Sequence, residues 1–413
     1  MTNSPFPKRA LEHIRVLDLT RVLAGPWCAQ NLADLGADVI KIERPGAGDD
    51  TRSWGPPYLR DANGRDTTEA AYYLAANRGK RSVTLDIASA EGQEIVRKLA
   101  RQSDVILENY KVGQLKKYGL DYESLRCEKP DLVYCSITGF GQDGPYAQRA
   151  GYDFIVQGMG GFMSITGERD DQAGGGPQKA GVAVSDLMTG MYATIAVMAA
   201  LTHRDRSGEG QYIDMALLDV QVAMLANMGS NFLASGKPPT RWGNAHPNIV
   251  PYQTFATADG HIIVAVGNDA QYAKFVAAGG RPGLANDERF ATNPMRVRHR
   301  EILVPILAEM VKTKTRKQWI DGLEAVGVPC GPINNLADVF DNPQVQARGL
   351  RVDLPHPTGG TVKLVRSPMH LSVTPPRCDL PPPLLGQHTD EVLRDLLGHS
   401  EEEIRALREK GIT

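Results

Sequence analysis

The chain has 413 residues, with 46 Lys and Arg against 48 Asp and Glu, and a formal net charge of −2 at pH 7. This balance gives no sign of a nucleic-acid partner or another polyanion. Hydrophobic residues make up 42% and charged residues 23%, which is typical of a soluble globular protein and excludes fibrous and wholly disordered classes. At about 150 residues per domain, the length predicts two or three folded units.

Cysteine and histidine form neither a disulfide framework nor a metal site. The five cysteines are scattered without a C-x-x-C pair, and the nine histidines form no H-x-x-x-H or H-E-x-x-H pattern. We therefore expect free thiols in a reducing, cytoplasmic location and no metal ion.

No segment has the features of a targeting or membrane-spanning sequence. The N-terminal residues lack the apolar run of a signal peptide. The longest apolar stretch, Met188–Leu201, is shorter than the roughly 20 residues that a membrane helix needs. It predicts a core helix in a protein with no membrane partner.

The first 140 residues alternate β-branched runs with amphipathic stretches, the order of a parallel α/β sheet. Ligands of such sheets usually bind at the loops that follow the carboxyl ends of the strands. In chain order, we expect a strand at Arg15–Leu19, a helix at Pro26–Leu35, strands at Asp38–Glu43 and Ser82–Asp86, a helix at Ala90–Gln102, and strands at Asp104–Glu108 and Asp131–Ile137.

A helix-rich stretch follows, and then a smaller α+β unit. The Ser185 hydroxyl is expected to cap a helix that runs to about Arg204. The segment Asp205–Pro251 mixes a turn, a strand, a helix and a polar tail, and the domain boundary is expected near its end. The later elements are expected to be a β-hairpin at Tyr252–Val266, helices at Gln271–Gly279, Met295–Lys312 and Lys317–Gly327, an extended proline-rich return, and a last helix that begins with a Ser400–Glu403 capping box.

One literal G-x-G-x-x-G motif, Gly139–Gly144, follows a predicted strand. In a dinucleotide-binding fold the third glycine opens a helix whose N–H groups meet the pyrophosphate. Here Pro145 and a polar segment follow instead. A nicotinamide-dependent oxidoreductase is therefore an alternative, while a flexible glycine-rich loop is the favoured interpretation.

Charged residues gather around the end of the second predicted strand. Glu43 stands where a ribose-binding acid would lie. The basic residues near it, Arg44, Arg52, Lys80 and Arg81, suit a nucleotide with an extra phosphate, because guanidinium groups bind phosphate well when shielded. A solvated basic face is the other interpretation, and the local sequence does not decide between them.

Asp186 also has two interpretations. As a first-turn residue it would stabilise the helix dipole by roughly 0.3–1 kcal/mol. The same position would suit a nucleophilic carboxylate that stays ionised near its ordinary pKa of about 3.9. His246 and His388 are isolated in predicted loops, where they could serve a site or be structural.

Seven segments decide between these interpretations. In chain order they are LDLTRVLAGPWCAQNLADLGADVIKIERPGAGDDTR, NRGKRSVTLD, ENYKVGQLKKYGLDY, CSITGFGQDGPYAQRAGYD, GVAVSDLMTGMYA, GVPCGPINN and PPPLLGQHTDEVL. Together they resemble the class III CoA-transferases, the carnitine-CoA and formyl-CoA transferase family. The resemblance runs from Leu17 to Leu393 and places the family's catalytic aspartate on Asp186 in VSDLMTG.

The resemblance implies an α/β fold with a large Rossmann-like domain completed by the C-terminus, a small α+β domain, and an interlocked homodimer. The corresponding boundaries are residues 1–204 for the first part of the large domain and 205–251 for a linker region. The small domain would span 252–330, an extended return linker 331–383, and the completion of the large domain 384–413.

The resemblance also implies covalent relay at Asp186. The carboxylate would attack an acyl-CoA thioester, and the CoA thiolate would return to give aspartyl-CoA. The acceptor acid would then reverse these steps. CoA is thus a substrate, with no permanently bound cofactor and no metal.

CoA contacts are carried over from the formyl-CoA member. Arg44, Leu85, Asn109 and Ala24 lie at its CoA-binding positions, and Lys117 replaces an arginine. Leu23, Thr138 and Phe140 replace a glutamine, a lysine and a tyrosine. The glutamine and the tyrosine line the substrate side in that relative, so oxalate and formate are poor candidates for the substrate. That relative's run of glycines over the intermediate has no clear counterpart, although Gly267–Gln271 could occupy the region.

The segments TRSWGPP and RWGNAHPNIVPYQTF look most like the branch of the family that acts on dicarboxylates. We expect succinyl-CoA as donor and a short dicarboxylate such as glutarate as acceptor. Its distal carboxylate needs a shielded cation, for which Arg21, Arg241 and His246 are the candidates.

Two further alternatives are kept. The α-methylacyl-CoA racemases of this family carry a histidine base in a GHD motif, where this chain has Tyr152, and a phenol is a poor base at neutral pH. A CoA-binding protein without turnover is the second alternative.

Overall fold

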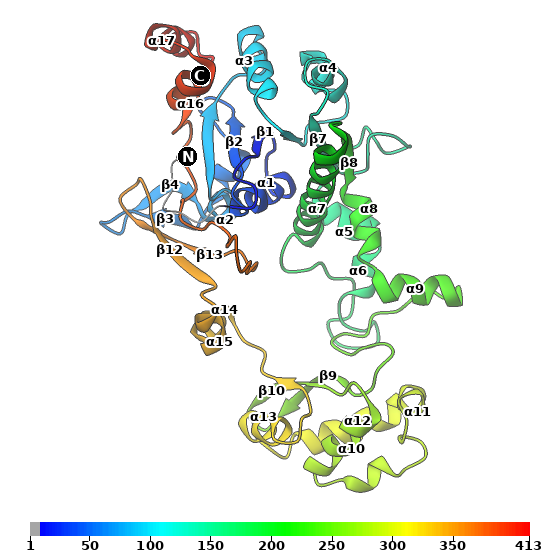
Figure 1. Cartoon of the computed structure of the whole chain (residues 1–413). Coiled ribbons are helices and arrows are strands. Elements are labelled where there is room, and N and C mark those ends of the chain that lie inside the picture. Colours follow the sequence, from blue (N-terminus) through cyan, green and yellow to red (C-terminus); the bar gives the residue numbers. More distant parts are fainter. Residues whose placement is uncertain (1–8) are drawn as a thin grey trace. The chain divides into compact units, whose positions relative to one another are not determined.

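The structure is a computed structural model, which describes residues 9–413 (Figure 1). The chain divides into two compact units. The first contains the described residues up to Phe162, together with Ala180–Ala226 and Pro343–Thr413. The second contains Met163–Lys179 and Asn227–Asn342. Each unit is therefore built from segments that are far apart in the sequence.

A six-stranded parallel sheet forms the centre of the first unit. Its strands are β1 (Arg15–Asp18), β2 (Asp38–Glu43), β5 (Lys80–Thr84), β6 (Val105–Glu108), β7 (Val133–Thr138) and β8 (Tyr212–Ala216), in the spatial order β5-β2-β1-β6-β7-β8. Numbered along this sheet alone, the order is 3-2-1-4-5-6, that of a doubly wound Rossmann sheet. The direction of winding reverses between β1 and β6, which makes this the switch point where such folds bind ligands.

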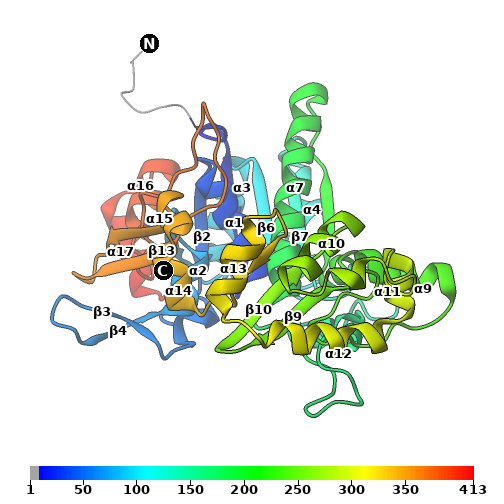
Figure 2. The ribbon, with the colours of Figure 1, turned by 90° about the horizontal axis from the view of Figure 1, so that it is seen from below.

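Helices cover both faces of the sheet because its inner strands are apolar on both sides. On one face Val105 and Leu107 pack with α1 (Ala24–Asp34) and α7 (Val184–Ser207). On the other face Ile106 packs with α3 (Ala90–Arg101). That second core is completed from the chain end by α16 (Thr389–Leu397) and α17 (Glu401–Glu409), through Val392, Leu393, Ile404 and Leu407. Figure 2 shows α16 and α17 beside each other in this unit.

Helix α7 is long and apolar enough to cross a membrane by length and composition, with a mean hydropathy of 1.4 over its most apolar window. Half of that window is buried inside the protein. Its residues Ala193 and Val197 lie in the core that α1 shares. We therefore interpret α7 as a core helix.

The remaining elements of the first unit are short. A hairpin of β3 (Tyr58–Arg60) and β4 (Asp66–Ala70) and a hairpin of β12 (Arg351–Pro355) and β13 (Thr361–Val365) lie outside the main sheet. The short helices are η1 (Asp50–Ser53), α2 (Ala71–Ala76), η2 (Leu115–Tyr118), α4 (Tyr122–Arg126), α5 (Asp153–Met159), α8 (Leu217–Ala223) and α15 (Pro343–Ala347), while α6 (Phe162–Ile165) and α9 (Ala226–Ser235) begin at the ends of its segments.

The second unit is built on an antiparallel sheet of β9 (Tyr252–Thr257), β10 (Gly260–Ala265) and β11 (Cys330–Gly331), in the order β11-β10-β9. A core that includes Phe275, Leu307 and Trp319 joins this sheet to the helices. The helices are α10 (Asp269–Ala278), η3 (Pro282–Ala285), α11 (Asn293–Arg298), α12 (Arg300–Val311), α13 (Arg316–Glu324) and α14 (Leu336–Asp341).

Most of the elements expected from the sequence are confirmed, and the Ser400–Glu403 capping box is present at α17. The expected helix Met295–Lys312 is two helices, because His299 leaves the helical backbone conformation between them. The linker region expected at 205–251 contains an edge strand of the main sheet, β8, followed by α8 and α9. The return expected to be extended at 331–383 contains α14, α15 and the β12–β13 hairpin.

The expected cap of α7 is wrong. Ala183 occupies the cap position and Ser185 lies inside the helix, where its hydroxyl donates 2.6 Å to the Gln221 side-chain oxygen. The backbone N–H groups at the start of α7 instead find their acceptor on α5, as described below.

Candidate functional site

A cavity of about 400 Å³ opens at the switch point of the sheet. The loops after β1, β6 and β7 line it together with the first turn of α7. Six of the residues selected from the sequence meet here: Arg21, Leu23, Ala24, Asn109, Thr138 and Asp186. The cavity therefore lies where a doubly wound fold is expected to bind its ligand.

Asp186 lies in the first turn of α7 and lines this cavity. The N–H groups of Ser185 and Asp186 donate to Asp153 Oδ1 on α5, over 2.8 and 3.3 Å. Asp153 thus takes up the helix-start donors that would otherwise stabilise a negative charge on Asp186. Burial, and then the nearby charge of Asp153, raise the pKa of Asp186 to about 7.

This pKa corrects the expectation from the sequence that Asp186 keeps an ordinary value near 3.9. A carboxylate with a raised pKa is more basic, and it is a stronger nucleophile once it is ionised. Asp186 therefore has the chemistry of a nucleophile whose ionisation begins near neutral pH.

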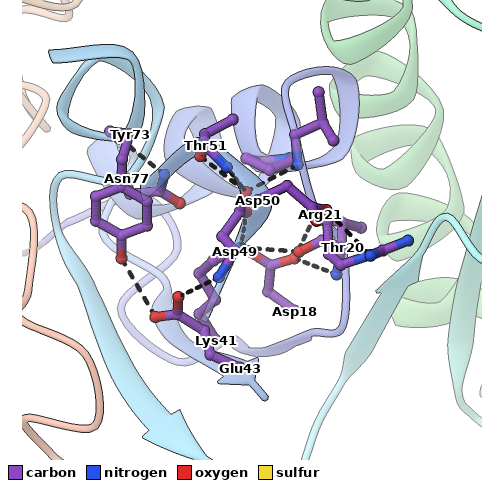
Figure 3. A network of polar contacts seen from close by, with 12 residues as sticks. Asp18, Thr20, Arg21, Lys41, Glu43, Asp49, Asp50, Thr51, Tyr73 and Asn77 are labelled. Carbon is purple, nitrogen blue, oxygen red and sulfur yellow. Dashed lines mark hydrogen bonds and ion pairs between the residues drawn. The ribbon is translucent and has the colours of Figure 1, made fainter. Parts of the chain in front are cut away.

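Buried charged side chains bond the backbone of the loop after β1 and hold it in place (Figure 3). Asp18 accepts from the backbone N–H of Thr20 at 2.9 Å, and the Lys41 ammonium donates 2.8 Å to the Thr20 carbonyl. The Lys41 ammonium also lies 2.9 Å from Asp49, whose other oxygen accepts from the Val22 N–H. Three charged side chains thus bond the backbone of this loop at Thr20 and Val22 and hold it in place.

The pKa of Asp49 shows how strongly this network of charged side chains stabilises the ionised carboxylate. Burial alone would raise the pKa of Asp49, but the charge of Lys41 and hydrogen bonds from Thr51 lower it to about 2. Lys80 holds Asp18 in the same way, with its ammonium 3.0 Å from the carboxylate. The Lys41–Asp49 pair therefore remains charged throughout the neutral pH range, whereas burial lowers the pKa of the Lys80 ammonium to about 8.

The same loop contains a strained residue. Val22 has φ of 71°, a left-handed conformation that a β-branched side chain rarely adopts. It lines the cavity directly. Its N–H bond to Asp49 fixes the strained conformation, and such strain typically costs about 1–3 kcal/mol.

Asn109 ties the loops on the two sides of the switch point together. Its side-chain oxygen accepts 2.9 Å from the Arg21 N–H, and its amide group donates 2.7 Å to the Arg21 carbonyl. The Arg21 guanidinium extends to Asp50 at 3.0 Å and lies over the Tyr110 ring. Asn109 therefore shapes the cavity from the β6 side.

A second cavity of about 470 Å³ adjoins the first, with which it shares the lining residues Arg21, Asp50, Tyr110 and Gln114. It contains two of the expected CoA contacts, Arg44 and Leu85. Two adjoining cavities suit an elongated substrate that has a reactive end near Asp186 and a distant, charged end near Arg44.

Residues 11–389 match CoA-transferase family III. The chain belongs to that family. It is 55% identical over 396 residues to a succinate–glutarate CoA-transferase of Agrobacterium fabrum. The matched region covers 96% of this chain and 98% of that protein. It is 44% identical over 404 residues to the human succinyl-CoA:glutarate CoA-transferase. This match covers 98% of this chain and 90% of the human protein.

A crystal structure of a CAIB/BAIF family protein from Brucella suis is similar, with a TM-score of 0.82 and 51% identity. The match covers 94% of this chain and 99% of that chain. The protein is thus a CoA-transferase with a mixed α/β fold around a parallel sheet, and it uses CoA thioesters as substrates.

The structure places the other expected residues of this CoA-transferase elsewhere. Neither Lys117 nor Phe140 lines the two cavities. Lys117 is exposed on η2, and the Phe140 ring makes an edge contact with the Tyr146 ring. Arg241 and His246 belong to the second unit. There the Arg241 guanidinium is already ion-paired with Asp170, and the His246 ring packs against Tyr252.

The structure corrects the expectation that the basic residues near Glu43 form a free phosphate site or a solvated face. Arg52 and Lys80 are buried, with Arg52 ion-paired to Glu43 at 2.8 Å and Lys80 to Asp18. They form neither a solvated face nor free phosphate ligands, and Glu43 is not a free ribose acceptor. Arg44 is the member of the cluster that lines a cavity.

The glycine-rich loop Gly139–Gly144 does not have the geometry of a nicotinamide site. It leads from β7 into a loop, and the next helix, α5, begins only at Asp153. Gly139 instead packs on Gly151 so closely that a Cβ atom on Gly139 would lie 2.5 Å from the Gly151 Cα. The two glycines shape the edge of the cavity.

Sequence reasoning did not assign a role to Asp153 or to the Lys41–Asp49 pair. Asp153 lies directly after the Gly151–Tyr152 pair that we compared with the racemases, so the motif itself was a signal. For Lys41 the available signal was its place between the apolar residues Ile40 and Ile42 of β2, because a lysine buried there requires a partner of opposite charge. Within residues 9–413, no group of three or more His, Cys, Asp or Glu side chains is placed to hold a metal ion.

Proposed function

We propose that this CoA-transferase moves CoA from succinyl-CoA to glutarate or another short dicarboxylate, through an aspartyl-CoA intermediate at Asp186. The observation that carries the proposal is the position of Asp186, which lines the switch-point cavity with a raised pKa. The dicarboxylates come from the names of the relatives, and the high identity over nearly the full chain supports their transfer to this protein.

In the first half of the reaction, an Asp186 oxygen attacks the thioester carbonyl carbon, and the C–S bond breaks. This gives a mixed anhydride and the CoA thiolate. The thiolate then attacks the aspartyl carbonyl carbon, and the C–O bond to the succinyl group breaks, releasing succinate. One thioester has replaced another, so no external energy source is required.

The acceptor carboxylate reverses these steps. It attacks the aspartyl thioester to form a second anhydride, and the thiolate attacks the acceptor carbonyl, which regenerates the Asp186 carboxylate. The chain's own contributions are to position the Asp186 carboxylate through Asp153, to shape the cavity through Asn109 and Gly139, and to bind the distant end of CoA near Arg44.

The intermediate can be tested by mass spectrometry. Incubation with succinyl-CoA without acceptor should add a CoA-sized mass to the wild-type chain, and Asp186→Asn should remain unmodified. Asp219→Asn, which neutralises an exposed carboxylate on α8, is the control that should still form the adduct. Rapid CoA exchange by the wild type together with normal exchange by Asp186→Asn would refute the covalent role.

Racemisation is separated from transfer by a different readout. A racemase would exchange the α-proton of a branched acyl-CoA with deuterium from heavy water. Tyr152, which is 61% exposed and lines the cavity, would have to act as the second base. Deuterium incorporation that requires both Asp186 and Tyr152 would replace our proposal.

We also propose that the protein is a homodimer with interlocked chains and that it is located in the cytoplasm. Large apolar side chains on α5 and α7 support an additional partner surface, because Phe154, Ile155 and Ile195 are between 46% and 60% exposed. The five free cysteines are compatible with a reducing compartment. Light scattering that gives the mass of a single chain would refute the dimer.

A further inference from the structure

One buried cation of the described chain lacks an ion-pair partner. Six Lys and Arg residues among residues 9–413 are buried, and Arg300, which is 8% exposed, is the one without a carboxylate within ion-pair distance. Buried charges are normally paired, since removing an ion from water is costly. The paired ones are Lys41 with Asp49, Arg52 with Glu43, Arg78 with Asp34, Lys80 with Asp18, and Arg296 with Asp269.

Arg300 begins α12 in the second unit, and only part of its guanidinium is used. Nη2 donates to the carbonyls of His246 and Pro247, over 3.2 and 2.7 Å. The Nε and Nη1 donors have no hydrogen bond to any residue that the structure describes. The guanidinium lies 4.1 Å from the centre of the Trp242 ring, which holds it in place without neutralising its charge.

The neighbouring charged side chains do not neutralise the positive charge of Arg300. Burial lowers the pKa of Arg300, Glu301 opposes this shift, and the positive charge of Arg169 adds to it. Arg169 itself is ion-paired with both Asp171 and Glu301. The Glu301 carboxylate is thus engaged by Arg169, and the positive charge of Arg300 is left for another anion.

Arg300 lines a cavity of about 490 Å³ that lies entirely within the second unit. The cavity is large enough for a small organic molecule. Neutral polar side chains are available for the rest of such a ligand, namely Asn244, Gln253 and Thr254. The charged lining residues are Glu168, Arg169, Arg300 and Glu301, so their formal charges cancel.

We propose that this cavity binds the carboxylate group of a small organic acid, with Arg300 as the charged ligand over the Trp242 ring. A singly charged group fits better than a phosphate dianion, because Glu168 and Glu301 would repel additional negative charge. Arg241, which we considered for this role from the sequence, is already paired with Asp170 and donates to the Glu168 carbonyl. The site does not depend on the chemistry proposed for Asp186.

Binding can be followed by tryptophan fluorescence without acyl-CoA. The signal of Trp242 is the difference in emission between the wild type and Trp242→Phe during titration with glutarate. We expect saturable binding that weakens about 10- to 100-fold in Arg300→Gln, the range of a lost charged hydrogen bond. Arg298→Gln, on the preceding helix and exposed, is the matched control and should keep the wild-type affinity.

Ligand controls test the proposal on the wild-type chain, even if Arg300→Gln fails to fold. The uncharged diamide of glutaric acid should leave the Trp242 signal unchanged. Inorganic phosphate should compete weakly, and propionate, with one carboxylate, should compete. An equal response to the diamide, stronger binding of phosphate than of glutarate, or unchanged affinity in folded Arg300→Gln would each overturn the proposal.

The same titration with Asp186→Asn separates this site from the proposed function. Glutarate should change the Trp242 signal of Asp186→Asn as it does in the wild type. Loss of the signal in this variant would show that the wild-type signal reports binding at the switch-point cavity, and would overturn the site at Arg300. A failure of CoA transfer with an intact Trp242 signal would instead concern the proposed function alone.

Discussion

Replacing Asp186, the proposed nucleophile, with Asn should make the protein more stable at neutral and alkaline pH. The pKa of Asp186 is about 7 in the folded protein, against about 3.8 for an unperturbed aspartate. Between these two values the folded protein binds one more proton at this position than the unfolded chain does. Its free energy of unfolding therefore falls as the pH rises through this range. Asp186→Asn removes that contribution.

The size of the effect follows from the shift. One unit of pKa difference corresponds to about 1.4 kcal/mol, so a shift of roughly three units gives an upper limit of about 4 kcal/mol at pH 8. The gain from Asp186→Asn should be smaller at pH 5, where the folded wild type keeps the proton. It should increase by about 1.4 kcal/mol per pH unit up to pH 7 and then remain constant.

Urea unfolding of the wild type and Asp186→Asn at several pH values between 5 and 8 measures this difference. Asp219→Asn, on the surface of α8, is the matched control and should show no such pH dependence. A difference that is absent at pH 8, or that decreases as the pH rises, would refute the raised pKa and with it the electrostatic description of the site.

Three further perturbations test other parts of the site. Asp153→Asn removes a negative charge next to Asp186 and should lower the pKa of that carboxyl. The acidic limb of the pH profile of kcat/KM, which we expect near pH 7, should then move about one pH unit lower. An unmoved limb would contradict the electrostatic coupling between Asp153 and Asp186. Lys41→Met leaves a buried carboxylate unpaired and should cost about 3–5 kcal/mol in urea unfolding. Lys317→Ala, in an exposed pair, should cost less than about 1 kcal/mol, and equal costs would refute the role of the buried network. Gly139→Ala introduces a Cβ atom 2.5 Å from the facing backbone and should destabilise the protein by about 1–3 kcal/mol and weaken CoA binding, as measured by calorimetry.

The sequence was sufficient for five of the six strands of the main sheet because its central strands are buried on both faces, whereas the edge strand β8 was expected in a linker region. Segments such as DVIKIE and DVILE are therefore recognisable without knowledge of their neighbours. The carboxyl ends of these strands also indicated where the cavity would lie. Asp186 was assigned from the motif around it, while its local sequence favoured a simple helix-start role.

The sequence was insufficient wherever the partner of a residue comes from a distant segment. Ser185 has the residue type of a helix cap, but Asp153 supplies the acceptor and Ser185 turns to Gln221 instead. Arg52 is a basic residue whose burial against Glu43 depends on tertiary packing. Arg300 gave no signal, because its missing partner becomes apparent only when its surroundings are known.

The position of α16 and α17 affects how the protein can fold during synthesis. Their apolar residues cover the face of the sheet that includes Val83 in β5, and the Ile412 carbonyl accepts from the Asp86 N–H. At 5–20 residues per second, a ribosome needs roughly 15–65 s to proceed from β5 to Ile412. During this interval α3 already packs on this face of the sheet, but the part that α16 and α17 will cover stays exposed. The first unit can therefore complete its native core only after α16 and α17 have been synthesised, and a truncation that removes these helices would remove part of that core.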